Sequence, residues 1–161
     1  MYVFVNIGSN VGDRRMHLSR ALRAIVAEYG MFEVSHTIES EPWGYESQRK
    51  FLNMGMMFQT EDAPEVILSI LKKIEQSICA DSHRDAEGNY VDRKIDIDII
   101  AIDDLVIDTP ELKVPHQHLP SRKFFLHPMN EIAPDWKHPV NGKTAAQMLV
   151  ELHSSEDKTK I

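Results

Sequence analysis

The sequence Ile95-Asp96-Ile97-Asp98-Ile99-Ile100-Ala101-Ile102 alternates isoleucine with aspartate and then becomes wholly apolar. On a β-strand, side chains two residues apart point to the same face, with Cα atoms roughly 6.6 Å apart. The first three isoleucines can therefore pack on a core while Asp96 and Asp98 share the opposite face. This alternation predicts a strand at residues 95–102 that carries two neighbouring carboxylates.

Further elements extend from this strand in both directions. Runs rich in β-formers predict strands at Tyr2–Ile7, Phe32–Ser40 and Phe51–Thr60, and a short partner strand at Leu105–Ile107 across Asp103-Asp104. Apolar residues at helical spacing predict helices at 18–29 and 64–78, and shorter tail helices at 122–130 and 144–152. The order β-α-β-β-α-β indicates an α+β, ferredoxin-like fold, with a mainly antiparallel sheet and helices packed on one face.

Length and composition limit the possible classes of protein. The 161 residues suit one domain, 1–161, whose last residues, 154–161, we expect to be frayed. Lys and Arg number 18 against 25 Asp and Glu, and the net charge of −7 argues against nucleic-acid binding but not against a small phosphorylated ligand. We see no signal peptide and no apolar run near the roughly 20 residues that span a bilayer. The single cysteine, Cys79, favours the cytoplasm, where we expect a monomer that binds small molecules.

The paired carboxylates of the strand suggest a metal site. Asp96 and Asp98 repel each other, and Mg²⁺, which prefers oxygen ligands, would relieve that repulsion while clamping a polyphosphate. The alternative is an ordinary amphipathic strand with a solvated acidic face. Arg93 stands just before the pair, where it could meet phosphate oxygens or simply form an ion pair with Asp96.

Two other groups of residues could bind a ligand. Pro115-His116-Gln117-His118 with Arg122 could contact an anion, could supply two zinc ligands, or could be a surface loop; zinc is weakly supported because the only cysteine is far away. The rings of Trp43, Phe51 and Phe124 could sandwich a flat heterocycle whose edge the amide of Asn53 reads, or could be core aromatics. Gly142-Lys143-Thr144 imitates the end of a P-loop, but position 137 is Lys rather than Gly.

Taken in order, several segments resemble one family, the 6-hydroxymethyl-7,8-dihydropterin pyrophosphokinases of folate biosynthesis. They are Ile7–Arg14 (IGSNVGDR), Glu41–Gly44 (EPWG), Phe51–Asn53 (FLN), Arg93–Ile100 (RKIDIDII), Val114–His116 (VPH), Arg122 with Phe124, and Glu131–Trp136 (EIAPDW). Each segment is modest alone, but their order and spacing over nearly the whole chain are specific.

The resemblance implies an ATP-dependent diphosphokinase that transfers pyrophosphate from ATP to the hydroxymethyl group of the dihydropterin and releases AMP. It implies two Mg²⁺ ions held by Asp96 and Asp98, with Arg93 as a third catalytic residue. The residues it places at ATP are Lys72, Glu75, Arg84, Arg93, His116 and Arg122. The residues it places at the pterin are Ser40, Trp43, Phe51, Asn53 and Phe124.

The chain also departs from the family pattern. Val91-Asp92 stands before Arg93 where members often carry Gly-Pro, and the preceding loop offers only His83 and Arg84 where the family is rich in arginine. These departures bear on the rate and on closure of that loop over ATP more than on the substrate. Two alternatives are another Mg²⁺-dependent nucleotidyl or phosphoryl transferase and a non-catalytic ligand-sensing domain on the same scaffold.

Overall fold

The computed structural model describes residues 1–30, 33–41, 49–78 and 95–159. Its main sheet contains β1 (Tyr2–Ser9), β2 (Glu33–Val34), β3 (Ile38–Ser40), β4 (Phe51–Gln59) and β5 (Asp96–Ile102). Two helices connect these strands, α1 (Arg14–Tyr29) and α2 (Pro64–Ile78). The tail contains β6 (Ile107–Asp108), β7 (Lys113–Val114), a 3₁₀ turn at Leu119–Ser121, α3 (Lys123–Ile132) and α4 (Ala145–Thr159).

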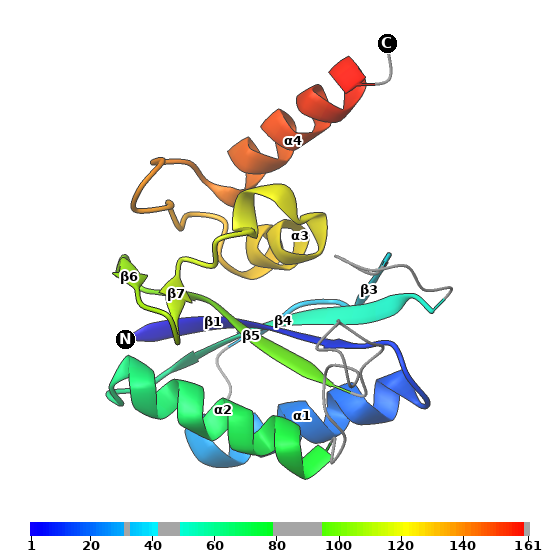
Figure 1. Cartoon of the computed structure of the whole chain (residues 1–161), viewed down its shortest axis with the longest axis vertical. Helices are drawn as coiled ribbons and strands as arrows, with labels where there is room; N and C mark the ends of the chain where they lie inside the picture. The colour runs from blue at the N-terminus through cyan, green and yellow to red at the C-terminus, as the bar shows by residue number, and fades with distance from the viewer. Residues whose placement is uncertain (31–32, 42–48, 79–94, 160–161) are drawn as a thin grey trace.

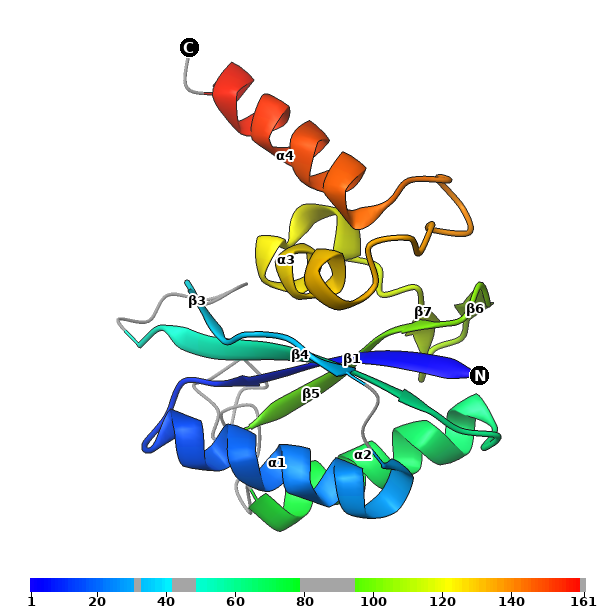
Figure 2. The same cartoon turned by 180° about the vertical axis from the view of Figure 1, so that it is seen from behind.

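The main sheet is open and antiparallel, in the order β2-β4-β1-β5, with β3 also paired to β4. Helices α1 and α2 lie side by side under one face of this sheet, and α3 covers the other face (Figure 1). The view from behind shows the same layers, with α4 projecting away from the body (Figure 2). The α+β class expected from the sequence is confirmed. The order is βαβββαβ, because the second predicted strand is split into β2 and β3, and α3 adds a third layer on the face that the sequence left uncovered.

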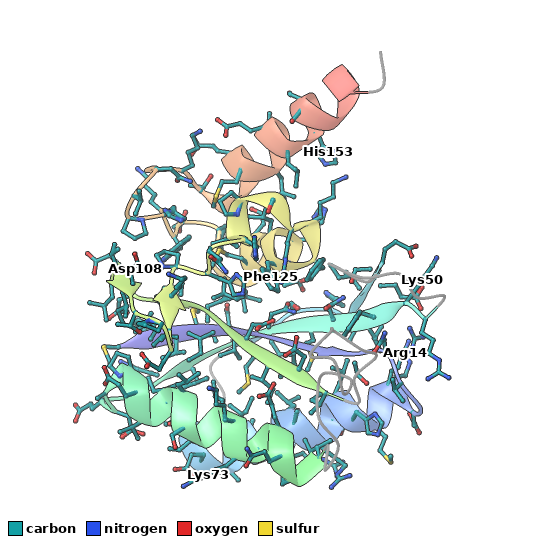
Figure 3. All side chains as sticks on the ribbon, viewed as in Figure 1. Arg14, Lys50, Lys73, Asp108, Phe125 and His153 are labelled. Carbon is teal, nitrogen blue, oxygen red and sulfur yellow. The ribbon has the colours of Figure 1, made fainter. Side chains whose placement is uncertain are left out.

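The central strand β1 is buried on both faces, so it contributes to two apolar clusters. Val3, Val5 and Ile7 belong to the cluster under α1 and α2, while Phe4 belongs to the cluster under α3 and α4. Phe125, labelled in Figure 3, lies between α3 and the sheet and is fully buried. Burial of this apolar surface on both faces is the main force that fixes the sheet between its helices.

A glycine on β4 lets α3 approach the sheet. A Cβ built on Gly55 would lie 2.7 Å from Cβ of Pro128 and 3.0 Å from Cζ of Phe4. Both distances are shorter than van der Waals contact, so only glycine allows this spacing between α3 and β4.

Three predicted elements differ from the structure. The predicted strand Phe32–Ser40 is split, because Gly55 N–H is accepted by the Ser35 side chain at 2.8 Å and the strand then breaks until Ile38. The predicted pairing of Leu105–Ile107 across Asp103-Asp104 is wrong: β6 pairs with β7, and Asp103 instead exchanges hydrogen bonds with Tyr2 of β1. Helix α4 continues beyond its expected end at 152. No helix in the described ranges is long and apolar enough to cross a membrane.

Candidate active site

The two aspartates of β5 lie on one face of an edge strand. Asp96 stands opposite Gly8, and Asp98 stands opposite Asn6, on the neighbouring strand β1. Both carboxylates are half-buried, whereas Ile97 between them is buried in the cluster under α1 and α2. The strand therefore alternates as its sequence predicts, and it holds two acidic side chains at the rim of the core.

Glu75 of α2 brings a third carboxyl group to this edge. Its Oε2 accepts the backbone N–H of Ile97 at 2.8 Å. Burial raises the pKa of Glu75 to about 8, and the nearby charge of Asp96, followed by that of Asp98, adds to the increase. The ligand-free site therefore holds more acidic groups than can all be ionised at neutral pH.

His116 faces Asp98 from the segment that follows β7. Its Nε2 lies 4.0 Å from Oδ1 of Asp98, and its Nδ1 accepts the backbone N–H of His118 at 3.1 Å. Burial lowers the pKa of His116 to about 4, and the positive charge of Arg122 lowers it further. At pH 7 the ring is therefore neutral, with its proton on Nε2, so His116 can donate one hydrogen bond toward the carboxylate side.

These groups border a cavity of about 370 Å³ between α2, β5 and residues 110–117. Five residues predicted for ATP or metal line it: Lys72, Glu75, Asp96, Asp98 and His116. Glu111, Lys113 and Gln117 line it as well, and sequence reasoning missed them because polar residues in loops and in a two-residue strand carry no periodic signal. The cavity thus combines carboxylates, a cation and apolar walls from Leu68 and Leu71.

A second cavity, of about 780 Å³, opens between β3 and α3. Ser40, Arg122 and Phe124, all predicted ligand-binding residues, line it together with Lys123, His127 and Glu131, which were not predicted. The Arg122 guanidinium carbon lies 5.5 Å from the centroid of the Phe124 ring and 5.1 Å from that of Phe125. This cation–π geometry holds the arginine against the aromatic wall.

Asn53 and Phe51 lie on β4, next to Ser40 of β3, which lines the second cavity. The Asn53 Nδ2 donates to Ser40 Oγ at 2.7 Å, and Asn53 itself is buried. Phe51 is half-buried and pairs with Ser40 in register. The structure therefore brings Ser40, Phe51 and Asn53 together on neighbouring strands. Ser40 and Phe124 line the second cavity, whereas Phe51 and Asn53 lie behind Ser40 and are not among the lining residues.

Three predicted site residues, Trp43, Arg84 and Arg93, lie outside the described residues. Within the described ranges, no group of three or more His, Cys, Asp or Glu side chains could hold a metal by itself. Two carboxylates on one face suit Mg²⁺ nevertheless, because this ion usually takes one or two carboxylates and completes its shell with water and substrate phosphates. The donor set of Asp96 and Asp98 therefore fits Mg²⁺.

Comparison with known proteins agrees with this geometry. A family described as 7,8-dihydro-6-hydroxymethylpterin-pyrophosphokinase (HPPK) matches residues 4–134. The 2-amino-4-hydroxy-6-hydroxymethyldihydropteridine pyrophosphokinase of Aquifex aeolicus is 37% identical over 141 residues, which cover 88% of this chain and 86% of that one. The protein of the same name from Porphyromonas gingivalis is 37% identical over 139 residues, 85% of this chain and 93% of its own.

Solved structures show the same fold in longer chains. A crystal structure of HPPK-DHPS in complex with substrates has a TM-score of 0.73 and 15% identity, covering 99% of this chain and 45% of that chain. Wild-type Plasmodium falciparum HPPK-DHPS with SDX-DHP also has a TM-score of 0.73, with 14% identity over 98% of this chain and 45% of its own. The chain thus spans less than half the length of these structural neighbours. On the sequence match and on this architecture, the chain belongs to the 7,8-dihydro-6-hydroxymethylpterin-pyrophosphokinase family.

Proposed function

We propose that the protein transfers the pyrophosphoryl group of ATP to the hydroxymethyl oxygen of 6-hydroxymethyl-7,8-dihydropterin, a step in folate biosynthesis. The observation that carries the proposal is the pair of cavities flanking the end of the sheet. His116 lines the first cavity and Arg122 the second, and both side chains contact the ring of Phe125: its centroid lies 4.9 Å from the centroid of His116 and 5.1 Å from the guanidinium carbon of Arg122. A triphosphate in the first cavity would therefore point its phosphates toward an acceptor in the second.

The first cavity is proposed as the ATP subsite. Lys72 offers a cation, and His116 offers the neutral Nε2–H, for phosphate oxygens that approach Asp98. Leu68 and Leu71 provide apolar contact for the base. Glu75 accepts the Ile97 N–H and so helps to position β5, and its predicted place beside the nucleotide remains a prediction. The predicted ATP contacts of Arg84 and Arg93, and the catalytic role of Arg93, remain predictions.

The second cavity is proposed as the pterin subsite. Phe124 and Phe51 would stack on the two faces of the ring, and Asn53 would hydrogen-bond its edge. Ser40 fixes the Asn53 amide at 2.7 Å, which limits the orientations from which that amide can read the ring. Trp43 belongs to the same prediction and lies outside the described residues.

We propose that Asp96 and Asp98 hold two Mg²⁺ ions. When bound, the ions would neutralise phosphate charge and make the β-phosphorus more electrophilic. Asp96 and Asp98 would hold the ions, and Lys72 and the Nε2–H of His116 would orient the phosphates beside them. No described side chain is assigned as general base.

In the reaction, the hydroxymethyl oxygen bonds to the β-phosphorus while the bond from that phosphorus to the α,β-bridging oxygen breaks. AMP leaves with the bridging oxygen, the β- and γ-phosphates remain together on the pterin, and the hydroxyl proton is released. Because the protein supplies positioning and electrostatics rather than a covalent intermediate, Arg122 and Lys72 would act by attracting the phosphates.

The finer expectations about the cellular setting also remain proposals. The single cysteine and the soluble-type composition support a cytoplasmic, monomeric, single-domain protein that binds small molecules and no nucleic acid.

Product analysis tests the proposed function directly. The protein is incubated with ATP, Mg²⁺ and 6-hydroxymethyl-7,8-dihydropterin, and nucleotides are separated by chromatography. We expect AMP and a pterin diphosphate in equal amounts. Formation of ADP or release of free pyrophosphate would indicate phosphoryl or nucleotidyl transfer instead, and binding without turnover would indicate a sensing domain.

A further inference from the structure

Asn6 is a polar residue in the middle of the apolar strand β1. Its neighbours along the chain, Val5 and Ile7, are fully buried, and Asn6 itself is only 2% exposed. Its Oδ1 is buried without a hydrogen-bond partner among the described residues. A buried acceptor that lacks a donor costs free energy, so stability alone does not explain an asparagine at this position.

A glycine near Asn6 leaves room for the amides of Asn6 and Asn53 to contact each other. Asn6 stands opposite Gly55 of β4, and the next row on the same face places Gly8 opposite Asn53. The asparagines therefore occupy one diagonal of a four-residue block and the glycines the other. A Cβ on Gly8 would lie 3.0 Å from Asn53 Oδ1, so the glycine leaves room for that amide. Across this space Asn6 Nδ2 donates to Asn53 Oδ1 at 3.4 Å.

Asn53 is thus held at both ends of its amide. Its Oδ1 accepts from Asn6, and its Nδ2 donates to Ser40 Oγ at 2.7 Å. A carboxamide has two N–H donors and two acceptor lone pairs. One donor and one lone pair of the amide therefore remain for a ligand, and a lactam edge, which presents a carbonyl next to an N–H, can use both.

Asn6 also stands opposite Asp98 on its other side. On the central strand, Asn6 therefore stands between β4, which carries Asn53, and β5, which carries a proposed metal-binding carboxylate. The printed side-chain contact of Asn6 is to Asn53, so its effect is expected on the pterin side.

We propose that Asn6 is a positioning residue of the pterin subsite. It holds the Asn53 amide in the orientation in which that amide can hydrogen-bond a lactam edge. This inference deepens the function proposed above and rests on it. Without Asn6, the Asn53 amide loses the donor that orients its oxygen, so recognition of the heterocycle weakens while the ATP subsite is unchanged.

The test measures binding of 6-hydroxymethylpterin in the presence of Mg²⁺ and α,β-methylene-ATP by isothermal titration calorimetry. Asn6→Ala removes the amide, and Asn6→Leu removes it while keeping the volume, which guards against a variant that fails to fold. We expect both variants to lose about three- to tenfold in pterin affinity, the value of one neutral hydrogen bond, with analogue affinity within about twofold of wild type.

Discrimination between heterocycles gives a second readout. In 2,4-diamino-6-hydroxymethylpteridine the donor and acceptor of the edge are exchanged, so wild type should prefer the pterin, and both variants should show a smaller preference. Val5→Ala is the matched control, because Val5 is the buried neighbour that faces the other cluster. It should lower stability and leave pterin affinity unchanged.

The outcomes separate the two proposals. If wild type binds the pterin and both Asn6 variants bind it within about twofold as well, the role of Asn6 is refuted while the function stands. If the Asn6 variants lose analogue affinity to the same extent as pterin affinity, the residue is merely structural and the inference is also refuted. If wild type itself does not bind the pterin, the proposed function fails and the inference fails with it.

Discussion

Replacing Glu75 by glutamine should remove a pH-dependent loss of stability from the ligand-free protein. In the folded chain the pKa of Glu75 is raised to about 8 by burial and by the charge of Asp96, whereas the ordinary value is 4.5. Glutamine has nearly the same shape as a protonated glutamate. Its carbonyl can still accept the Ile97 N–H, and its amide can donate to Asp96.

The sign of the effect follows from proton binding. Between pH 4.5 and pH 8 the folded state retains a proton that the unfolded state has released, so the free energy of unfolding falls as the pH rises through this window. Each pH unit is worth about 1.4 kcal/mol while the proton is fully retained, and half of it is released at pH 8, so this group lowers the free energy of unfolding by about 2 kcal/mol from pH 6 to pH 8. Glu75→Gln carries no titrating group and should lack this loss.

Denaturant unfolding at pH 6 and pH 8 measures the effect, with EDTA present so that no divalent cation neutralises the cluster. The quantity of interest is the change in unfolding free energy between the two pH values, compared between wild type and Glu75→Gln. Glu65→Gln, an exposed carboxyl on the same helix, serves as the control and should behave like wild type. If wild type and Glu75→Gln lose equal free energy over this range, the reasoning about the acidic cluster is refuted.

Two other predictions concern the helix layer and the neutral histidine. Gly55→Ala should destabilise the fold by about 1–3 kcal/mol, because the new Cβ would lie 2.7 Å from Pro128 Cβ and α3 must move; an unfolding midpoint equal to wild type would contradict the tight packing. His116→Gln should lower turnover without changing the shape of the pH–rate profile between pH 6 and pH 8, because the pKa of His116 is about 4 and the ring is neutral throughout. A wild-type inflection near pH 6.5 that disappears in this variant would show that the ring titrates in that range.

Elements with a regular apolar pattern were predictable from sequence. The alternation in residues 95–102 and the apolar stripes of α1 and α2 reflect burial against neighbours, which is what secondary-structure periodicity records. The same pattern placed Asp96 and Asp98 on one face, as the structure has them. Helices and strands were therefore predictable from the sequence wherever one of their faces is buried.

Features that depend on distant side chains were not predictable. The break between β2 and β3 includes His36, whose backbone N–H is accepted by the carboxylate of Glu131, 95 residues away. The pairing of β6 with β7 likewise depends on how Asp103 meets β1. A single sequence carries no periodic signal for such contacts.

Two residues of the site illustrate the same limit. Glu75 was expected near ATP from the family resemblance, but its bond to Ile97 N–H could not be read from a helix surface position. Asn6 gave one available signal, a lone amide in the otherwise apolar run Val3–Ile7. Its partner Asn53 becomes evident only once the register of β1 and β4 is known.

Binding of α,β-methylene-ATP as a function of Mg²⁺ tests most directly that the two carboxylates of β5 tether the triphosphate through divalent cations. Wild type, Asp96→Asn and Asp98→Asn are compared by isothermal titration calorimetry. Each substitution keeps the shape of the side chain and removes one negative charge from the cavity. We expect tight, Mg²⁺-dependent binding to wild type and a loss of at least about tenfold in affinity in each variant. Mg²⁺-dependent binding of equal strength in wild type and both variants would contradict it.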